Sequence, residues 1–120
     1  MNTKFDIIVV GGGLVGLAAA FKIQQKKPEK TMLILEKEED LALHQSGRNS
    51  GVLHSGLYYQ PGSHRAKNCV IGRRELVEFA KEYNIDHDVC GKLVVATNKQ
   101  ELDMLPTLLS RGKENGLRNL

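Results

Sequence analysis

The sequence predicts an α/β fold whose sheet is at least partly parallel, because two apolar runs flank a helical pattern. Residues 5–10 (FDIIVV) form a continuous apolar run rich in β-branched side chains, typical of a strand buried on both faces. Residues 31–36 (TMLILE) form a second such run. A strand, a helix and a parallel strand in this order make a βαβ unit with a right-handed crossover.

The segment between the two runs predicts a short helix that follows a glycine-rich turn. Its apolar residues recur near helical spacing at Leu14, Leu17, Ala18, Phe21 and Ile23. Polar residues from Lys22 to Lys26 supply the opposite face, and the helix is expected to end before Pro28.

The remainder predicts a long loop, two further helices and one more strand. Residues 37–62 have no helical period and are expected to form a functional loop with one helical turn inside it. A helix is expected from an N-cap at Ser63 to Asn84, and a strand within residues 88–97, which contain LVVA. Asn98 and a glutamate three positions later predict a capping box for a last helix, which Pro106 is expected to kink or split.

Composition excludes several classes of function. The 17 basic and 14 acidic residues are scattered and aromatic residues make up 5%, so a nucleic-acid surface is not expected. Cys69 and Cys90 lack any metal-binding spacing and are expected to be reduced, so no metal site is predicted. Residues 7–21 are interrupted by glycines and too short for a membrane span. They do not fit a secretory signal, because only Lys4 precedes them as a basic residue, Asp6 lies ahead of the apolar run and no small-residue cleavage site follows. We expect a cytoplasmic protein, either free or in peripheral contact with the inner face of the membrane.

The turn after the first predicted strand carries the strongest functional motif. Gly11, Gly13 and Gly16 form GxGxxG, in which the glycines allow a tight turn, the approach of a pyrophosphate and close packing of helix on strand. The helix N-terminus directs its N–H groups at the phosphates. The cofactor-binding turn also includes Gly12, Leu14 and Val15.

An acidic residue follows at the spacing that this motif requires. Glu36 ends the second predicted strand, 20 residues after Gly16, where it can accept hydrogen bonds from both ribose hydroxyls of an adenosine. The same acid disfavours a 2′-phosphate, so NADP is not expected. We include the neighbouring Lys37 in the predicted cofactor site.

The choice between NAD and FAD depends on residues 44–59, which occupy the place of the next helix and strand of a classical NAD dehydrogenase. Small residues there can lie against a flat ring system, which favours a flavin. Ser46, Asn49 and Ser50 offer short donors and acceptors, and Arg48 offers a cation to a phosphate or a substrate carboxylate. His44 and Gln45 complete the predicted cofactor-binding set. The alternative is a polar surface loop.

At this point the sequence resembles the FAD-dependent oxidoreductases related to D-amino-acid oxidase, and within them the L-2-hydroxyglutarate oxidases and dehydrogenases. The resemblance rests on DIIVVGGGLVGLAAA, on LEKEEDLALHQSGRNSGVLHSGLYYQPGSHRAKNCVIGRREL and on CGKLVVAT. It implies a Rossmann-like fold with non-covalent FAD. It also implies pyrophosphate on residues 11–16, the adenine ribose on Glu36, and residues 46–54 near the flavin.

His54 is the candidate catalytic residue. Oxidation of a 2-hydroxy acid needs a base for the hydroxyl proton, and a histidine of near-neutral pKa beside the ring can serve. Two other interpretations remain open: His54 orients the loop or bonds the flavin, or it is an exposed histidine. For His44 and Arg48, two roles stay open: catalysis, or binding of the cofactor.

The resemblance implies a chain that continues into a substrate domain, so residues 1–120 are expected to be the amino-terminal, truncated part of an FAD-binding domain. The expected substrate is L-2-hydroxyglutarate, oxidised to 2-oxoglutarate. The electron acceptor stays open between oxygen, a quinone and another carrier. Two alternatives remain open. One is an amino-acid or amine oxidase on the same scaffold, and the other is an inactive nucleotide-binding fragment.

Overall fold

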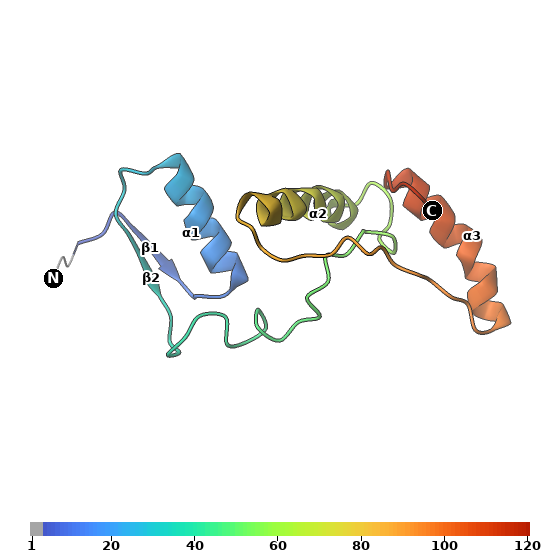
Figure 1. Ribbon diagram of the computed structural model, residues 1–120, viewed down its shortest axis with the longest axis horizontal. Coiled ribbons are helices and arrows are strands. Elements are labelled where there is room, and N and C mark those ends of the chain that lie inside the picture. Colours follow the sequence, from blue (N-terminus) through green and yellow to red (C-terminus); the bar gives the residue numbers. More distant parts are fainter. Residues whose placement is uncertain (1–3) are drawn as a thin grey trace. The chain divides into compact units, whose positions relative to one another are not determined.

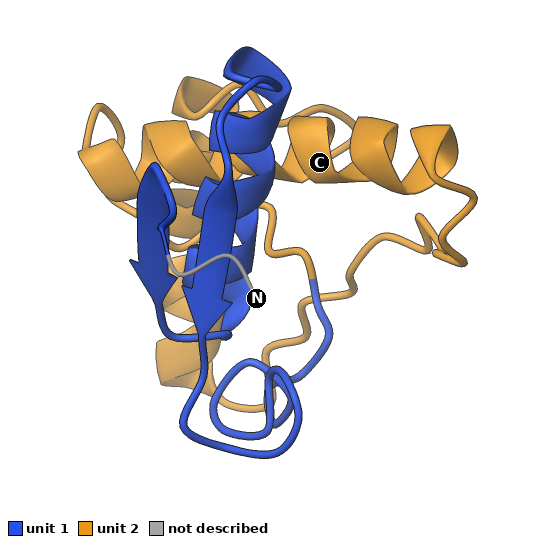
Figure 2. Ribbon diagram, turned by 90° about the vertical axis from the view of Figure 1, so that its left-hand side faces the viewer, with its two compact units in different colours: residues 1–52 blue, residues 53–120 orange. Residues whose placement is uncertain are grey.

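The computed structural model describes residues 4–120. The chain divides into two compact units, Met1–Val52 and Leu53–Leu120, which Figure 2 distinguishes by colour. Each unit has its own secondary structure and is described by itself.

The first unit contains a βαβ arrangement, as predicted. Strand β1 (Ile7–Val10) leads through the glycine turn into helix α1 (Leu14–Lys26), and strand β2 (Met32–Leu35) returns beside β1 (Figure 1). The two strands pair in parallel, with Ile7 opposite Met32 and Val10 opposite Leu35. The expected Rossmann-like α/β class and the parallel pairing are therefore confirmed. Both strands are shorter than the apolar runs that predict them.

A polar cluster fixes the start of this sheet. The Asp6 carboxylate accepts hydrogen bonds from the backbone N–H and the hydroxyl of Thr31, both at 2.9 Å, and Lys30 Nζ lies 3.2 Å from its other oxygen. These contacts, led by the Thr31 N–H, lower the pKa of Asp6. The strands thus begin from a hydrogen-bonded clamp that sets their register.

One face of the small sheet carries α1, and the other is open in the described chain. Ile8 and Val10, at alternate positions of β1, are 55% and 82% exposed. The buried hydrophobic residues among residues 4–120 are three alanines: Ala20, Ala66 and Ala80. Two parallel strands and one helix therefore leave much apolar surface uncovered, whereas parallel sheets in complete domains are covered on both faces.

The second unit contains two helices, α2 (His64–Glu82) and α3 (Lys99–Glu114). The predicted N-caps are confirmed: Ser63 Oγ accepts from the Ala66 N–H at 3.2 Å, and Asn98 Oδ1 accepts from the Glu101 N–H at 2.9 Å. The Glu101 carboxylate reaches back to the Thr97 N–H at 2.7 Å, one residue before the cap.

One prediction for this unit is wrong, and one of the two alternatives given for Pro106 is wrong. Residues 88–97 form no strand, because within residues 4–120 no other strand offers its N–H and C=O groups to the LVVA segment. Pro106 does not split the last helix, which runs continuously from Lys99 to Glu114. A proline removes one N–H donor, and here the helix continues past that loss.

Candidate nucleotide-binding site

The glycine turn joins β1 to the N-terminus of α1 with the backbone geometry that the motif requires. Gly11 has a φ of +100°, a conformation that glycine adopts without strain, and its N–H donates to the Leu35 carbonyl at 2.8 Å. A Cβ atom on Gly16 would collide with the Gly11 carbonyl oxygen, so the third glycine allows the helix to pack directly on the turn. The N-cap of α1 is Gly13, which has no side chain to cap the helix.

The Glu36 carboxylate lies against this turn. One oxygen accepts from the Gly12 N–H at 2.6 Å, and the other accepts from the N–H groups of Lys37 and Glu38 at 2.8 and 3.1 Å. These donors, with Gly12 the largest contributor, hold the pKa of Glu36 below its usual value. An ionised carboxylate offers about four acceptor positions, so three internal bonds still leave room for a hydroxyl donor.

The loop after β2 folds back over the turn. Ser46 Oγ accepts from the Leu14 N–H at 2.8 Å, at the first residue of α1. The Ala42 N–H donates to the Gly12 carbonyl at 3.1 Å. Ser46 therefore supplies the side-chain acceptor that Gly13 lacks.

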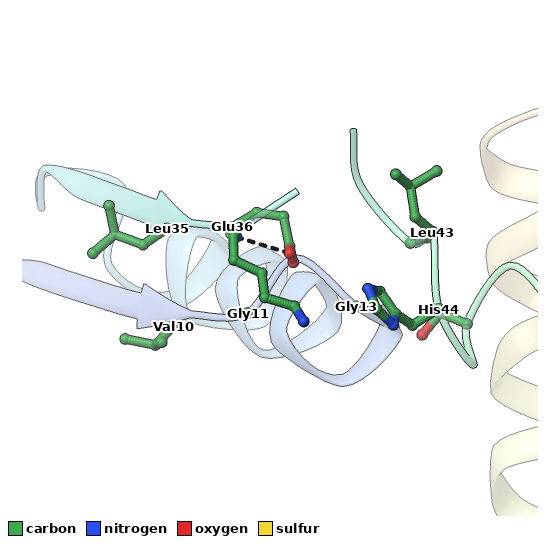
Figure 3. A pocket seen from close by; sticks show the side chains of 10 residues that line it. Val10, Gly11, Gly13, Leu35, Glu36, Leu43 and His44 are labelled. Carbon is green, nitrogen blue, oxygen red and sulfur yellow. Dashed lines mark hydrogen bonds between the residues drawn. The ribbon is translucent and has the colours of Figure 1, made fainter. Parts of the chain in front are cut away.

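An open pocket of about 350 Å³ lies beside the turn (Figure 3). Figure 3 shows Val10 and Leu35 where β1 and β2 end, with Glu36, Leu43 and His44 around the pocket. Ligands of open α/β sheets bind at this carboxyl edge of the strands. The lining residues come from the strand ends, the turn and the following loop: Val10, Gly11, Gly13, Leu35, Glu36, Lys37, Ala42, Leu43, His44 and Ser46.

The Glu38 carboxylate bonds two side chains at the rim of this pocket. His44 Nε2 is 2.8 Å from Glu38 Oε1, and Lys37 Nζ is 3.3 Å from the same oxygen. The hydrogen bond to His44, followed by that to Lys37, lowers the pKa of Glu38. His44 can therefore help to orient the loop through Glu38.

Several predicted site residues lie outside this group. Gln45, Arg48 and Ser50 are exposed and do not line the pocket. The Asn49 side chain bonds within its own turn, donating to the Ser46 carbonyl at 2.7 Å and accepting from the Gly51 N–H at 2.7 Å. The Val15 side chain is exposed and does not line the pocket, so any role of this residue rests on its backbone.

His54 belongs to the second unit, whereas the glycine turn belongs to the first. Its side chain is exposed, and its carbonyl oxygen accepts a bond from Cys69 Sγ at 3.0 Å. Its catalytic role stays a prediction.

Three residues near the turn were not predicted from the sequence. Leu41 approaches Gly12, and Ala42 and Leu43 line the pocket. Ala42 also has a φ of +60°, rare for a residue with a Cβ atom. Nothing in the sequence pattern indicates that apolar residues of a polar loop lie against the glycine turn.

The geometry fits the adenosine diphosphate half of FAD. The turn leads into the N-terminus of α1, where an anion is stabilised, and a carboxylate with spare acceptor capacity stands beside it. The N–H groups of Gly12 and Leu14 already donate to Glu36 and Ser46. Among residues 4–120, no group of three or more His, Cys, Asp or Glu side chains could hold a metal ion. None of the helices in the described range has the length and apolar character needed to cross a membrane.

Comparisons with known proteins agree with this chemistry. Residues 6–119 match the family model described as FAD dependent oxidoreductase. An L-2-hydroxyglutarate dehydrogenase of Indibacter alkaliphilus is 54% identical over 114 residues, 95% of this chain and 29% of the relative. Mitochondrial L-2-hydroxyglutarate dehydrogenases of Nematostella vectensis and Homo sapiens are each 47% identical over 119 residues, 99% of this chain and 26% of each relative. The chain thus spans between a quarter and a third of the length of these relatives.

Proposed function

Because the chain belongs to the FAD-dependent oxidoreductase family, we propose that it is the FAD-binding part of a protein that oxidises L-2-hydroxyglutarate to 2-oxoglutarate. The cofactor of this family is FAD. The observation that carries the choice of substrate is the 44–54% identity, over at least 95% of this chain, to relatives named L-2-hydroxyglutarate dehydrogenase.

We assign the glycine turn and Glu36 to the adenosine diphosphate half of FAD. The N-terminus of α1 would meet the pyrophosphate, and the remaining acceptor capacity of Glu36 would meet a ribose hydroxyl. Lys37, His44 and Ser46 line the same pocket and complete the assignment. Arg48, Asn49 and Ser50 do not line the pocket, and we assign them to the flavin end of the cofactor only because of their position in the sequence.

His54 is proposed as the base for the reaction. The bound flavin supplies an acceptor for the hydride that leaves the substrate's α-carbon. A neutral imidazole can take the proton of the substrate's hydroxyl group. The α-hydrogen leaves the carbon with two electrons as a hydride, and the C–O bond becomes a carbonyl.

The proposal is tested by product formation with the full-length protein. We expect 2-oxoglutarate to form from L-2-hydroxyglutarate in the presence of an artificial electron acceptor, with much slower reaction of the D-enantiomer. Oxidation of amino acids or amines in preference to L-2-hydroxyglutarate would support the other substrate class of this scaffold and overturn the proposal.

The electron acceptor and the location of the protein are further proposals. We propose oxygen or a quinone as acceptor, and a cytoplasmic protein that is free or bound peripherally at the inner face of the membrane. Oxygen consumption compared with reduction of a soluble quinone distinguishes the acceptors. Fractionation of cells into soluble and salt-extractable membrane fractions tests the location.

A further inference from the structure

The segment from His54 to Tyr59, called here the histidine segment, ends in a turn within the second unit. The Tyr59 N–H donates to the Gly56 carbonyl at 3.2 Å, which closes the turn. Gly56 is buried and has a φ of +91°, a conformation that glycine adopts without strain. The backbone that follows His54 therefore has one defined path.

The Asn115 side chain bonds both ends of this turn. Its amide Nδ2 donates to the Gly56 carbonyl at 3.1 Å and to the Tyr59 carbonyl at 3.0 Å. An amide nitrogen carries two protons, so both bonds can form at once. The bonded residues are 59 and 56 positions apart along the chain, so these bonds hold the histidine segment to a distant part of the unit.

The backbone around Asn115 is itself fixed by the end of α3. The Gly116 N–H donates to the Lys113 carbonyl at 3.0 Å. The Leu117 N–H donates to the Gly112 carbonyl at 2.9 Å. With Gly116 at a φ of +76°, these two bonds form a Schellman motif, which ends the helix at Asn115. The Asn115 side chain therefore starts from a defined place.

Two further contacts hold the histidine segment against the helices. Cys69 Sγ, on α2, donates to the His54 carbonyl at 3.0 Å. A Cβ atom on Gly112 of α3 would lie 2.9 Å from Leu57 Cδ1, so the missing side chain of this glycine makes room for Leu57. The His54 side chain is exposed, so an accessible imidazole stands on a backbone that both helices hold.

We propose that Asn115 is a positioning residue for His54, because it bonds the turn that follows the base and so fixes where the imidazole lies. This inference rests on the proposed function, in which His54 takes the proton of the substrate's hydroxyl group. A general base has to lie within hydrogen-bond distance of that proton, and a displacement of about 1 Å can lower the rate about 10²-fold. Asn115 itself is assigned no contact with the substrate or the flavin.

The test measures flavin reduction by L-2-hydroxyglutarate without oxygen in the full-length protein, with rates expressed per bound flavin. Asn115→Ala removes both donors. Asn115→Asp keeps the shape of the side chain, but an ionised carboxylate has no proton to donate. Asn84→Ala is the matched control, because Asn84 lies just after the other helix of the second unit and, within residues 4–120, its side chain makes no hydrogen bond to the histidine segment.

The Asn115 variants and the control are expected to differ in rate but not in stability. Both Asn115 variants should retain FAD and the wild-type half-saturating concentration of substrate, while the maximal rate of flavin reduction falls between about tenfold and 100-fold. Asn84→Ala should keep the wild-type rate. It too should lower the melting temperature, because Asn84 has a φ of +53°, which asparagine tolerates better than alanine. A general loss of stability would therefore not imitate the effect.

A double variant shows whether Asn115 acts through His54. In His54→Ala there is no imidazole left to position, so the addition of Asn115→Ala should lower the rate no further. A further loss as large as the loss in the wild-type background would mean that Asn115 acts independently of the base, and would overturn the inference.

A wild-type rate in Asn115→Ala would also overturn the inference. So would a wild-type rate in Asn115→Asp, because the shape of the side chain and not its two hydrogen bonds would then be what matters. If Asn115→Ala does not fold, Asn115→Asp decides, alone and combined with His54→Ala. A wild-type rate in His54→Ala, or a flavin that L-2-hydroxyglutarate does not reduce, would instead contradict the proposed function, and the inference would fall with it.

Discussion

Glu36 is the residue that links the sheet to the turn, because its carboxylate accepts three backbone N–H groups. Glu36→Gln replaces a charged acceptor with a neutral amide of similar shape. We expect FAD binding to the full-length protein to weaken about tenfold or more, the scale of a hydrogen bond to a charged group. Equilibrium titration of the flavin-free protein measures the effect, and wild-type affinity would remove Glu36 from the site.

The same carboxyl makes stability depend on pH. Its pKa is lower in the folded chain than the ordinary 4.5, chiefly through the Gly12 N–H. Such a group stabilises the fold above its unfolded pKa, and the contribution is lost as pH falls through the folded value. Wild-type stability should therefore fall below pH 4.5 more steeply than that of Glu36→Gln. The remaining slope in the variant is expected from Asp6, Glu38 and Glu101, whose pKa values are lowered too.

His54 can be separated from cofactor binding by substitution. In the full-length protein, His54→Ala should retain FAD but lower turnover of L-2-hydroxyglutarate by roughly 10²–10⁴-fold if the imidazole is the general base. Flavin absorbance and initial rates give the two readouts. A wild-type rate would reject the catalytic role, whereas joint loss of flavin and activity would favour a structural one.

At the residue scale, the sequence predicts which side chains lie near the glycine turn but not the hydrogen bonds that they make within the chain. The spacing from Gly16 to Glu36 predicts an acid beside the turn, because a strand of fixed rise and a helix of fixed length lie between them. The same spacing contains no information on the Gly12 N–H that this acid binds. For Ser46, the residue type predicts a polar contact with the pyrophosphate or the edge of the flavin ring, whereas the structure shows its hydroxyl as an acceptor for the Leu14 N–H.

At the element scale, helix caps provide the clearest energetic test. Asn98→Ala removes the acceptor for the Glu101 N–H at the start of α3. We expect a loss of about 1 kcal/mol in the free energy of unfolding, the usual value of an N-cap side chain. Denaturant titration of the full-length protein measures it. Asn98→Asp keeps an acceptor at this position and serves as the control; an equal loss in both variants would show that the cap does not matter.

The elements that were predicted correctly depend on local patterns. The starts of α2 and α3 follow from capping side chains at Ser63 and Asn98, which act within three residues. The strand expected in residues 88–97 was wrong because a strand needs a partner, which LVVA does not encode. Of the two effects expected of Pro106, the split does not occur, because the remaining turns of α3 maintain the helix.

At the scale of the whole molecule, the described chain leaves unusually large apolar surface in water. Val10, Val15 and Leu93 are 82%, 84% and 86% exposed, while the buried hydrophobic residues are three alanines. We therefore expect residues 1–120, produced alone, to bind a hydrophobic dye, to self-associate and to retain little FAD. Size-exclusion chromatography with flavin quantification is the measurement. A soluble monomer with one FAD per chain would contradict this expectation.

The most direct test of the account is the spectrum of the flavin that copurifies with the full-length protein, recorded without oxygen before and after addition of L-2-hydroxyglutarate. We expect an oxidised flavin whose visible absorbance is bleached by the L-enantiomer, with 2-oxoglutarate formed in equal amount, and is unaffected by the D-enantiomer. A protein that carries no flavin, or a bound flavin that L-2-hydroxyglutarate leaves oxidised, would contradict it.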